Sequence, residues 1–313
     1  MVLASGALFA VNGTVSKLVL RAGVPAPQLT LLRAAGAFAG LLVLSLLIPP
    51  GPRRLALQRR EVPLLLVYGV SGFCLVPMLY FVAISRMPVG IALLFEYMAP
   101  LLVALWARFG QHQPVRPRLW AGLVLSLTGL ACVAEVWGEF HLDGLGVAAG
   151  LGAAVLLTFY YVLGARGVQH RDALSLTTWA FAAATAAGLL IRAVTPGTAD
   201  WSALSRSEAG IPVVLLCCSV VLFGSILPYL LVAGALRHLP ATSVGILGMV
   251  EPVIAAAVAW LVLGRGEALN AAQLAGGALV LAGVTLAETA RITPETGTPS
   301  AEPLVTAARP GEP

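Results

Sequence analysis

The chain is a near-continuous series of apolar runs, each close to the length that crosses the hydrocarbon core of a bilayer, about 30 Å. We count ten runs, separated by short breaks that are charged or rich in proline and glycine. They cover residues 2–20, 29–48, 62–83, 89–109, 119–137, 145–164, 174–193, 211–236, 241–263 and 269–288. With 59% hydrophobic and 11% charged residues, the composition lies outside that of soluble globular domains. The sequence therefore predicts an all-α membrane protein with ten transmembrane helices in a lipid bilayer.

Two stretches of the chain carry the same proline frame. PVGIALLFEYMAP runs from Pro88 to Pro100, and PATSVGILGMVEP runs from Pro240 to Pro252. Further matches keep nearly the same spacing: Pro63 and Pro77 with Pro212 and Pro228, and Gly122 and Gly129 with Gly276 and Gly283. This pattern predicts a duplication. We expect a first five-helix repeat at residues 1–138, a second at 139–290, and a disordered cytoplasmic tail at 291–313.

An odd number of spans in each repeat has a consequence for the topology. The second repeat must enter the membrane from the opposite side, so the two five-helix repeats are expected to be inverted. Such a pair has two ways of packing, one open to each side of the membrane, which is the basis of alternating access. The acidic break between the repeats, with Glu139, His141 and Asp143, is expected to be a short outer turn.

The distribution of positive charge predicts that both termini are cytoplasmic in an inner-membrane protein. With that orientation, twelve of the nineteen Lys and Arg residues fall in inner loops and the tail, and five fall in outer loops. The net charge of +5 is explained by this bias and predicts no nucleic-acid partner. The first run begins without a basic leader or a cleavage site, which argues against a cleaved signal and leaves an upstream start open.

Four matched prolines lie inside the predicted spans: Pro77, Pro100, Pro228 and Pro252. Each removes a backbone donor and clashes with the preceding turn, so the helices are expected to bend there and to leave carbonyl groups free. The alternative is that they only shape the bundle, because proline is common in membrane helices.

Two glutamates lie near the middle of the predicted spans, Glu96 in the fourth and Glu251 in the ninth. A carboxyl group at the membrane centre costs roughly 2.5 to 3.5 kcal/mol on insertion scales, so its presence favours a function. Either glutamate is a candidate for substrate contact or for proton coupling. The alternative is a hydrogen bond to a neighbouring helix or to backbone opened by the adjacent proline.

Five further residues are candidates for a polar binding site. Asn12 lies on a polar stripe of the first span, and Arg33 lies near the outer end of the second. Arg33 either contacts substrate or extends its charged end to the headgroups. Tyr80 and Tyr229 lie close to the matched prolines, and Tyr161 lies inside the sixth span. Other aromatic residues within spans are Tyr97, Tyr160 and Trp179.

Motifs for catalysis, metal binding or cofactor binding are missing from the sequence. It has no HExxH, GxSxG or Walker-type pattern, and its four cysteines fall inside apolar runs without metal-type spacing. We therefore expect neither an enzyme nor a cofactor.

Several of these features together resemble the EamA-type branch of the drug/metabolite transporter superfamily. They are Arg33 early in the second span, the Glu251-Pro252 pair, and AWLVLGRGEALNAAQLAGGALVLAGV from Ala259 to Val284. Here the family's LGE link reads LGRGE, with its acid at Glu267, and the first repeat has ARFGQHQP at the corresponding place. The resemblance implies a carrier of small metabolites, often an exporter of amino acids or toxic compounds, with a central cavity between the repeats.

The resulting expectation is a secondary transporter that moves a small amino-acid-like or drug-like molecule, by export and by alternating access. Proton coupling is one option, and an uncoupled facilitator or exchanger is another. A membrane scaffold or a membrane enzyme without transport is the alternative of a different class. The sequence leaves open the substrate, the direction, the coupling ion and whether the protein is a homodimer.

Overall fold

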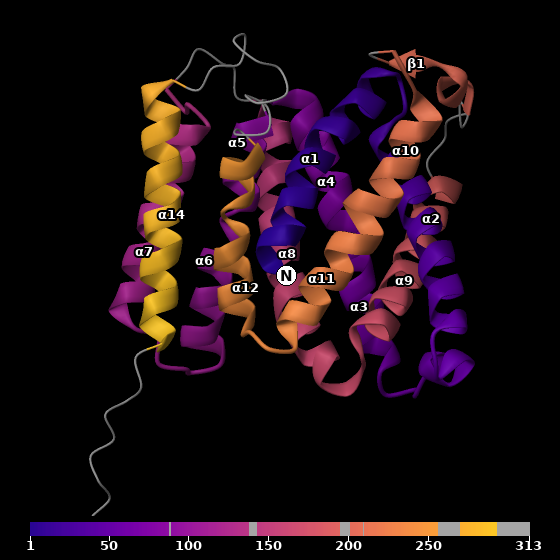
Figure 1. Cartoon of the computed structure of the whole chain (residues 1–313), viewed down its shortest axis with the longest axis horizontal. Coiled ribbons are helices and arrows are strands. Elements are labelled where there is room, and N and C mark those ends of the chain that lie inside the picture. Colours follow the sequence, from indigo (N-terminus) through magenta and orange to yellow (C-terminus); the bar gives the residue numbers. More distant parts are fainter. Residues whose placement is uncertain (88, 138–142, 195–200, 209, 256–269, 293–313) are drawn as a thin grey trace, which may run out of the picture.

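The structure is a computed structural model that describes residues 1–87, 89–137, 143–194, 201–208, 210–255 and 270–292 (Figure 1). Pro88, the turn at Glu139 and His141, and the tail from residue 293 lie outside these residues. So does Glu267 with the rest of 256–269, which includes the end of the ninth predicted span. Within the described residues the chain is almost entirely helical.

Five long helices are continuous. They are α1 (Val2–Arg21), α2 (Ala26–Leu47), α8 (Gly144–His170), α9 (Ala173–Val194) and α14 (Ala271–Ile292). Three others consist of shorter α-helical and π-helical segments in line. They are α3 (Val62–Gly69), η2 (Val70–Leu75) and α4 (Val76–Arg86); α5 (Val89–Glu96), α6 (Ala99–Leu105) and η3 (Trp106–Gly110); and α10 (Val213–Val221), η5 (Leu222–Ile226) and α11 (Leu227–Leu236).

Eight helical stretches of the described residues are long and apolar enough to cross a membrane. The other two predicted spans correspond to shorter apolar helices, α7 (Pro117–Val133) and the stretch Ala241–Ala255, which contains α12 (Ala241–Gly248). At 1.5 Å per residue, α7 is about 25 Å long. The expectation of an all-helical, multi-pass membrane protein is confirmed, and the count of ten spans depends on these two shorter helices.

Short elements connect the helices at the two ends of the bundle. They are η1 (Gly51–Leu55), η4 (Trp201–Ser205), β1 (Ser207–Glu208) and β2 (Ile211–Pro212). The strands pair antiparallel, with Ser207 opposite Pro212. The eighth span was expected to begin at Ile211, but α10 begins at Val213. Pro212 has extended geometry and caps the helix instead of entering it.

All four prolines inside the predicted spans stand where an α-helix is interrupted. Pro77 and Pro228 are the second residues of α4 and α11, each directly after a π-helical segment. Pro100 is the second residue of α6, after a turn at residues 97–98, and Pro252 follows a turn at 249–250 in the same way. A proline cannot donate its backbone bond and displaces the preceding turn, which explains the interruptions. The α-helices are therefore interrupted at all four prolines at which a bend was predicted.

Paired helices form the left and right sides of the molecule in Figure 1, with α7 and α14 on the left and α2 and α9 on the right. Between them, α8 packs against α4, α5 and α6, and α1 packs against α10 and α11. Ser45 of α2 and Thr178 of α9 share a buried hydrogen bond of 3.0 Å.

The packing of α7 against α14 depends on glycine. A methyl group built at Gly122 would lie 2.5 Å from the carbonyl oxygen of Gly283, and one at Gly129 would lie 2.6 Å from that of Gly276. The contacts are reciprocal, because methyl groups at Gly276 and Gly283 would meet the carbonyl oxygens of Gly129 and Gly122. The two helices therefore cross antiparallel with their backbones in contact, as small residues permit in membranes.

Candidate functional site

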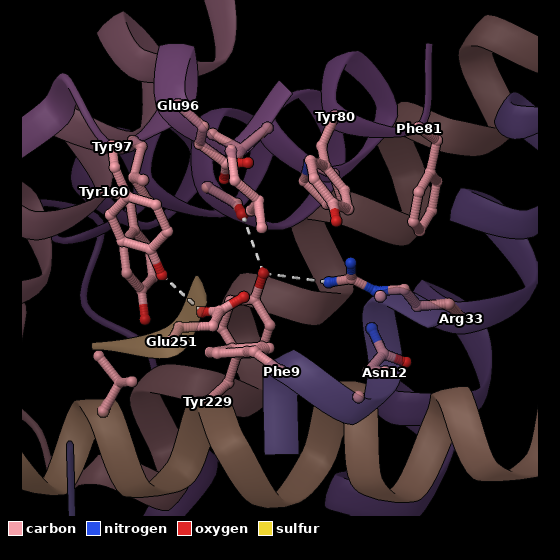
Figure 2. Close-up of a pocket in the computed structure, with 18 of the residues that line it drawn as sticks. Phe9, Asn12, Arg33, Tyr80, Phe81, Glu96, Tyr97, Tyr160, Tyr229 and Glu251 are labelled. Atoms are coloured by element: carbon pink, nitrogen blue, oxygen red, sulfur yellow. Dashed lines mark hydrogen bonds between the residues drawn. The ribbon is translucent and has the colours of Figure 1, made fainter. Parts of the chain in front are cut away.

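A cavity lies at the centre of the bundle, where α1, α2, α4, α5, α8 and α11 meet the residues around Glu251 (Figure 2). Its volume of about 100 Å³ is several times what one water molecule needs. All seven residues singled out from the sequence line this cavity: Asn12, Arg33, Tyr80, Glu96, Tyr161, Tyr229 and Glu251. The structure therefore brings together candidates that lie far apart in the chain.

The interruptions of the helices place polar groups at the cavity. Gly72 of η2 and Gly224 of η5 both line it, each a few residues before a matched proline. Glu96 is the last residue of α5, and Glu251 directly follows the turn at 249–250. Non-helical backbone at membrane depth is tolerated where it lines a cavity, and π-helical turns are frequent at functional sites.

Arg33 extends into the cavity. Its burial argues against the alternative in which the charged end of the side chain reaches the lipid headgroups. Its side chain starts about 10 Å along α2, and the residue is 3% exposed. One Nη donates a 3.2 Å hydrogen bond to the Tyr229 hydroxyl, and the guanidinium lies 5.3 Å from the centre of the Tyr229 ring. Among the described residues Arg33 has no carboxylate partner, and its Nε has no hydrogen bond.

The two glutamates of the cavity differ in their contacts. The Tyr97 hydroxyl donates a 2.6 Å hydrogen bond to Glu251, which links the break after α5 to the break after α12. Glu96 lines the cavity without a hydrogen bond to any other described residue. The alternative in which a carboxyl bonds a neighbouring helix therefore applies to Glu251 and not to Glu96.

Asn12 and Tyr80 approach neighbouring helices where a glycine leaves room. The Asn12 amide packs against Gly224, where a methyl group would overlap it. The Tyr80 hydroxyl lies at Gly13, 3.2 Å from the position of a methyl group there. The buried Oδ1 of Asn12 has no hydrogen-bond partner among the described residues.

Aromatic rings in tilted and edge-on contact surround Tyr229 beside the cavity. The Tyr229 ring lies 4.4 Å from Phe73, 5.3 Å from Phe9 and 5.8 Å from Tyr160, measured between centroids. Edge-to-face contacts of this kind are among the arrangements that aromatic pairs prefer. Of the other aromatic residues considered, Tyr97 and Tyr160 line the cavity, whereas Trp179 packs against the apolar core.

Sequence reasoning missed several lining residues. Gly72 and Gly224 were detectable only as glycines placed shortly before matched prolines. Phe81, Leu93, Leu157 and Val232 are also in the lining, and nothing in their local sequence distinguishes them from other apolar residues. Within the described ranges, no group of three His, Cys, Asp or Glu side chains is arranged to hold a metal.

The helical architecture and the polar cavity at its centre are those of a multi-pass membrane transporter. The family model of the EamA-like transporter family matches residues 1–134 and again 144–289. The chain therefore belongs to a family of transporters and not of enzymes.

Curated relatives include the threonine/homoserine exporter RhtA of Escherichia coli strain K12, which is 34% identical over 264 residues, 83% of this chain and 81% of the relative. The protein of the same name from Salmonella typhimurium strain LT2 is 34% identical over 257 residues, 80% and 78% of the two chains. The uncharacterized transporter YdfC of Bacillus subtilis is 24% identical over 72% and 71%. A crystal structure with 21% identity matches 93% of this chain and 96% of its own, with a TM-score of 0.74, which shows the fold.

Proposed function

We propose that this protein exports a small amino acid of the threonine or homoserine type across the inner membrane. The observation that carries the proposal is the cavity, which is lined by two glutamates and by a buried arginine that has no carboxylate partner among the described residues. The 34% identity to threonine/homoserine exporters over most of both chains supports the same substrate type.

We propose that export proceeds by alternating access between two inverted five-helix halves, residues 1–138 and 139–290. Three observations support this. The family model matches twice, the helix interruptions occur at matched prolines in both halves, and the glycine contacts of α7 and α14 are reciprocal and antiparallel. Both termini are then cytoplasmic, as the charge distribution predicts.

The direct test is transport in inverted membrane vesicles, which take up what intact cells export. Vesicles that contain the protein are expected to accumulate labelled threonine or homoserine faster than vesicles without it. Lys17→Gln is a suitable control variant, because Lys17 is a cation of α1 outside the cavity lining. Uptake of both amino acids no faster than in the empty vesicles would contradict the proposal.

Proton coupling is the finer form of the proposal, and it is favoured by Glu96, which has no hydrogen bond to another described residue. An imposed pH gradient is expected to change the rate of labelled homoserine flux in wild-type proteoliposomes, and Glu96→Gln is expected to abolish that response. If the rate of homoserine flux through the wild-type protein is the same with and without the pH gradient, the protein is an uncoupled facilitator or exchanger.

A further inference from the structure

We propose that the cavity binds its substrate as a zwitterion in one orientation, with the carboxylate on Arg33 and the ammonium group at Glu96 and Glu251. The inference rests on the proposed function, which leaves open how the site recognises an amino acid. It assigns specificity to three named side chains.

The Arg33 end of the cavity is built for an anion. A guanidinium has five N–H donors and stays charged, and Arg33 uses one of them on Tyr229 in the described part of the chain. Its Nε is buried and has no hydrogen-bond partner among the described residues, although an unpaired buried charge is strongly unfavourable. A substrate carboxylate would accept two parallel hydrogen bonds from this group, which no neutral ligand group does as well. The Asn12 amide lies on the same side of the cavity (Figure 2).

The opposite end of the cavity is built for a cation. Figure 2 shows Glu96 and Glu251 on the side away from Arg33, with the Tyr229 hydroxyl between the two ends. Both carboxyl groups line the same cavity. Tyr97 donates to Oε2 of Glu251, whereas Oε1 of Glu251 and both oxygens of Glu96 accept no hydrogen bond from another described residue. An ammonium group has three donors for such oxygens.

This arrangement selects against ligands with a single charge. An anion satisfies Arg33 and is repelled at the glutamates, whereas a cation leaves Arg33 unpaired and is repelled by it. In a buried site these interactions are much stronger than in water. A zwitterion satisfies both ends at once.

The test uses three probes of nearly equal size as competitors of labelled homoserine uptake into inverted vesicles. They are homoserine, the amino alcohol in which CH₂OH replaces the carboxylate, and the hydroxy acid in which OH replaces the ammonium group. With the wild-type protein, the two singly charged analogues are expected to compete about 10- to 100-fold more weakly than homoserine, the range for a lost charge-assisted hydrogen bond.

Variants then test which residues bind the carboxylate of the substrate and which bind its ammonium group. Arg33→Gln is expected to weaken homoserine about 10- to 100-fold and to remove its advantage over the amino alcohol, while its advantage over the hydroxy acid persists. The double variant Glu96→Gln with Glu251→Gln is expected to remove the advantage over the hydroxy acid instead. Arg33→Lys, which keeps the charge without the planar fork, is expected to be intermediate. Lys17→Gln is expected to match the wild type.

The outcomes separate this inference from the proposed function. If wild-type vesicles transport homoserine but accept either analogue equally well, the zwitterion inference is overturned and the proposed function stands. The same holds if Arg33→Gln weakens all three probes by one factor. If wild-type vesicles transport neither homoserine nor threonine, the proposed function fails and the inference fails with it. The comparison of analogues on the wild-type protein requires no variant to fold.

Discussion

The Tyr97 hydroxyl donates a 2.6 Å hydrogen bond to the carboxyl group of Glu251, 154 positions further along the chain. Both residues lie where a helix is interrupted, and both line the central cavity. The bond therefore connects two interrupted helices beside the cavity, one from each of the two stretches that the family model matches.

Removal of that hydrogen bond is expected to slow transport. Tyr97→Phe leaves the buried Glu251 carboxyl without its donor, and a buried acceptor left without a hydrogen bond costs about 1 to 3 kcal/mol. We expect homoserine flux in proteoliposomes to fall about tenfold with normal amounts of folded protein. Tyr68→Phe is the matched control, because the Tyr68 hydroxyl is buried and lies outside the cavity lining. Equal flux in Tyr97→Phe and wild type would show that the bond has no role in transport.

A methyl group at Gly224 is expected to disturb the site through Asn12. Gly224→Ala overlaps the Asn12 amide, which has to move, and overpacking of this kind costs about 1 to 3 kcal/mol. Transport assays on vesicles with equal protein content should show a clear loss of homoserine uptake. Gly144→Ala, at a position where a methyl group meets nothing within 4 Å, should leave uptake unchanged. The prediction is wrong if the two alanine variants behave alike.

The reciprocal contacts of α7 and α14 predict that matched glycines respond alike. Gly122→Ala and Gly276→Ala each drive a methyl group against the facing backbone, and both should destabilise the protein by about 1 to 3 kcal/mol. Thermal unfolding in detergent measures the effect, again with Gly144→Ala as control. A large loss at one position and none at the other would contradict the two-fold relationship.

An ion pair at one end of the bundle predicts a pH dependence. Arg171 donates two hydrogen bonds to Glu61, of 3.1 and 2.7 Å, which tie the α2–α3 loop to the α8–α9 loop. These bonds hold the pKa of the Glu61 carboxyl below its ordinary value. Because the pKa is lower in the folded state, the stabilisation is present above the unfolded value of about 4.3 and is lost as the pH falls through the folded value.

Glu61→Gln should therefore lower the unfolding temperature at pH 7, and the difference from wild type should shrink as the pH falls below about 4. Thermal unfolding in detergent over this pH range is the measurement. Gln113→Glu, at an exposed loop position, controls for a general effect of one charge. A difference between Glu61→Gln and wild type that stays constant with pH would exclude the ion pair as its source.

Much of the candidate site was predictable because intramembrane polar residues are costly and therefore few. Glu96, Glu251 and Arg33 stand out in apolar runs on composition alone, and all three line the cavity. The bond between Tyr97 and Glu251 was not predictable, because it depends on the rotation of two helices from different halves. The choice for Arg33 between headgroups and cavity was open for the same reason.

The amino-acid sequence by itself determined the membrane class, the helical runs and the prolines at which helices are interrupted, because these follow from local hydrophobicity and from the missing proline N–H. Tertiary structure decided which faces of those helices meet. It placed seven side chains from distant parts of the sequence around one cavity. It also buried Arg33 without a carboxylate partner among the described residues and brought Gly122 into contact with Gly283. The physical reason is that helix rotation and register are set by close packing between distant segments, which no local pattern encodes.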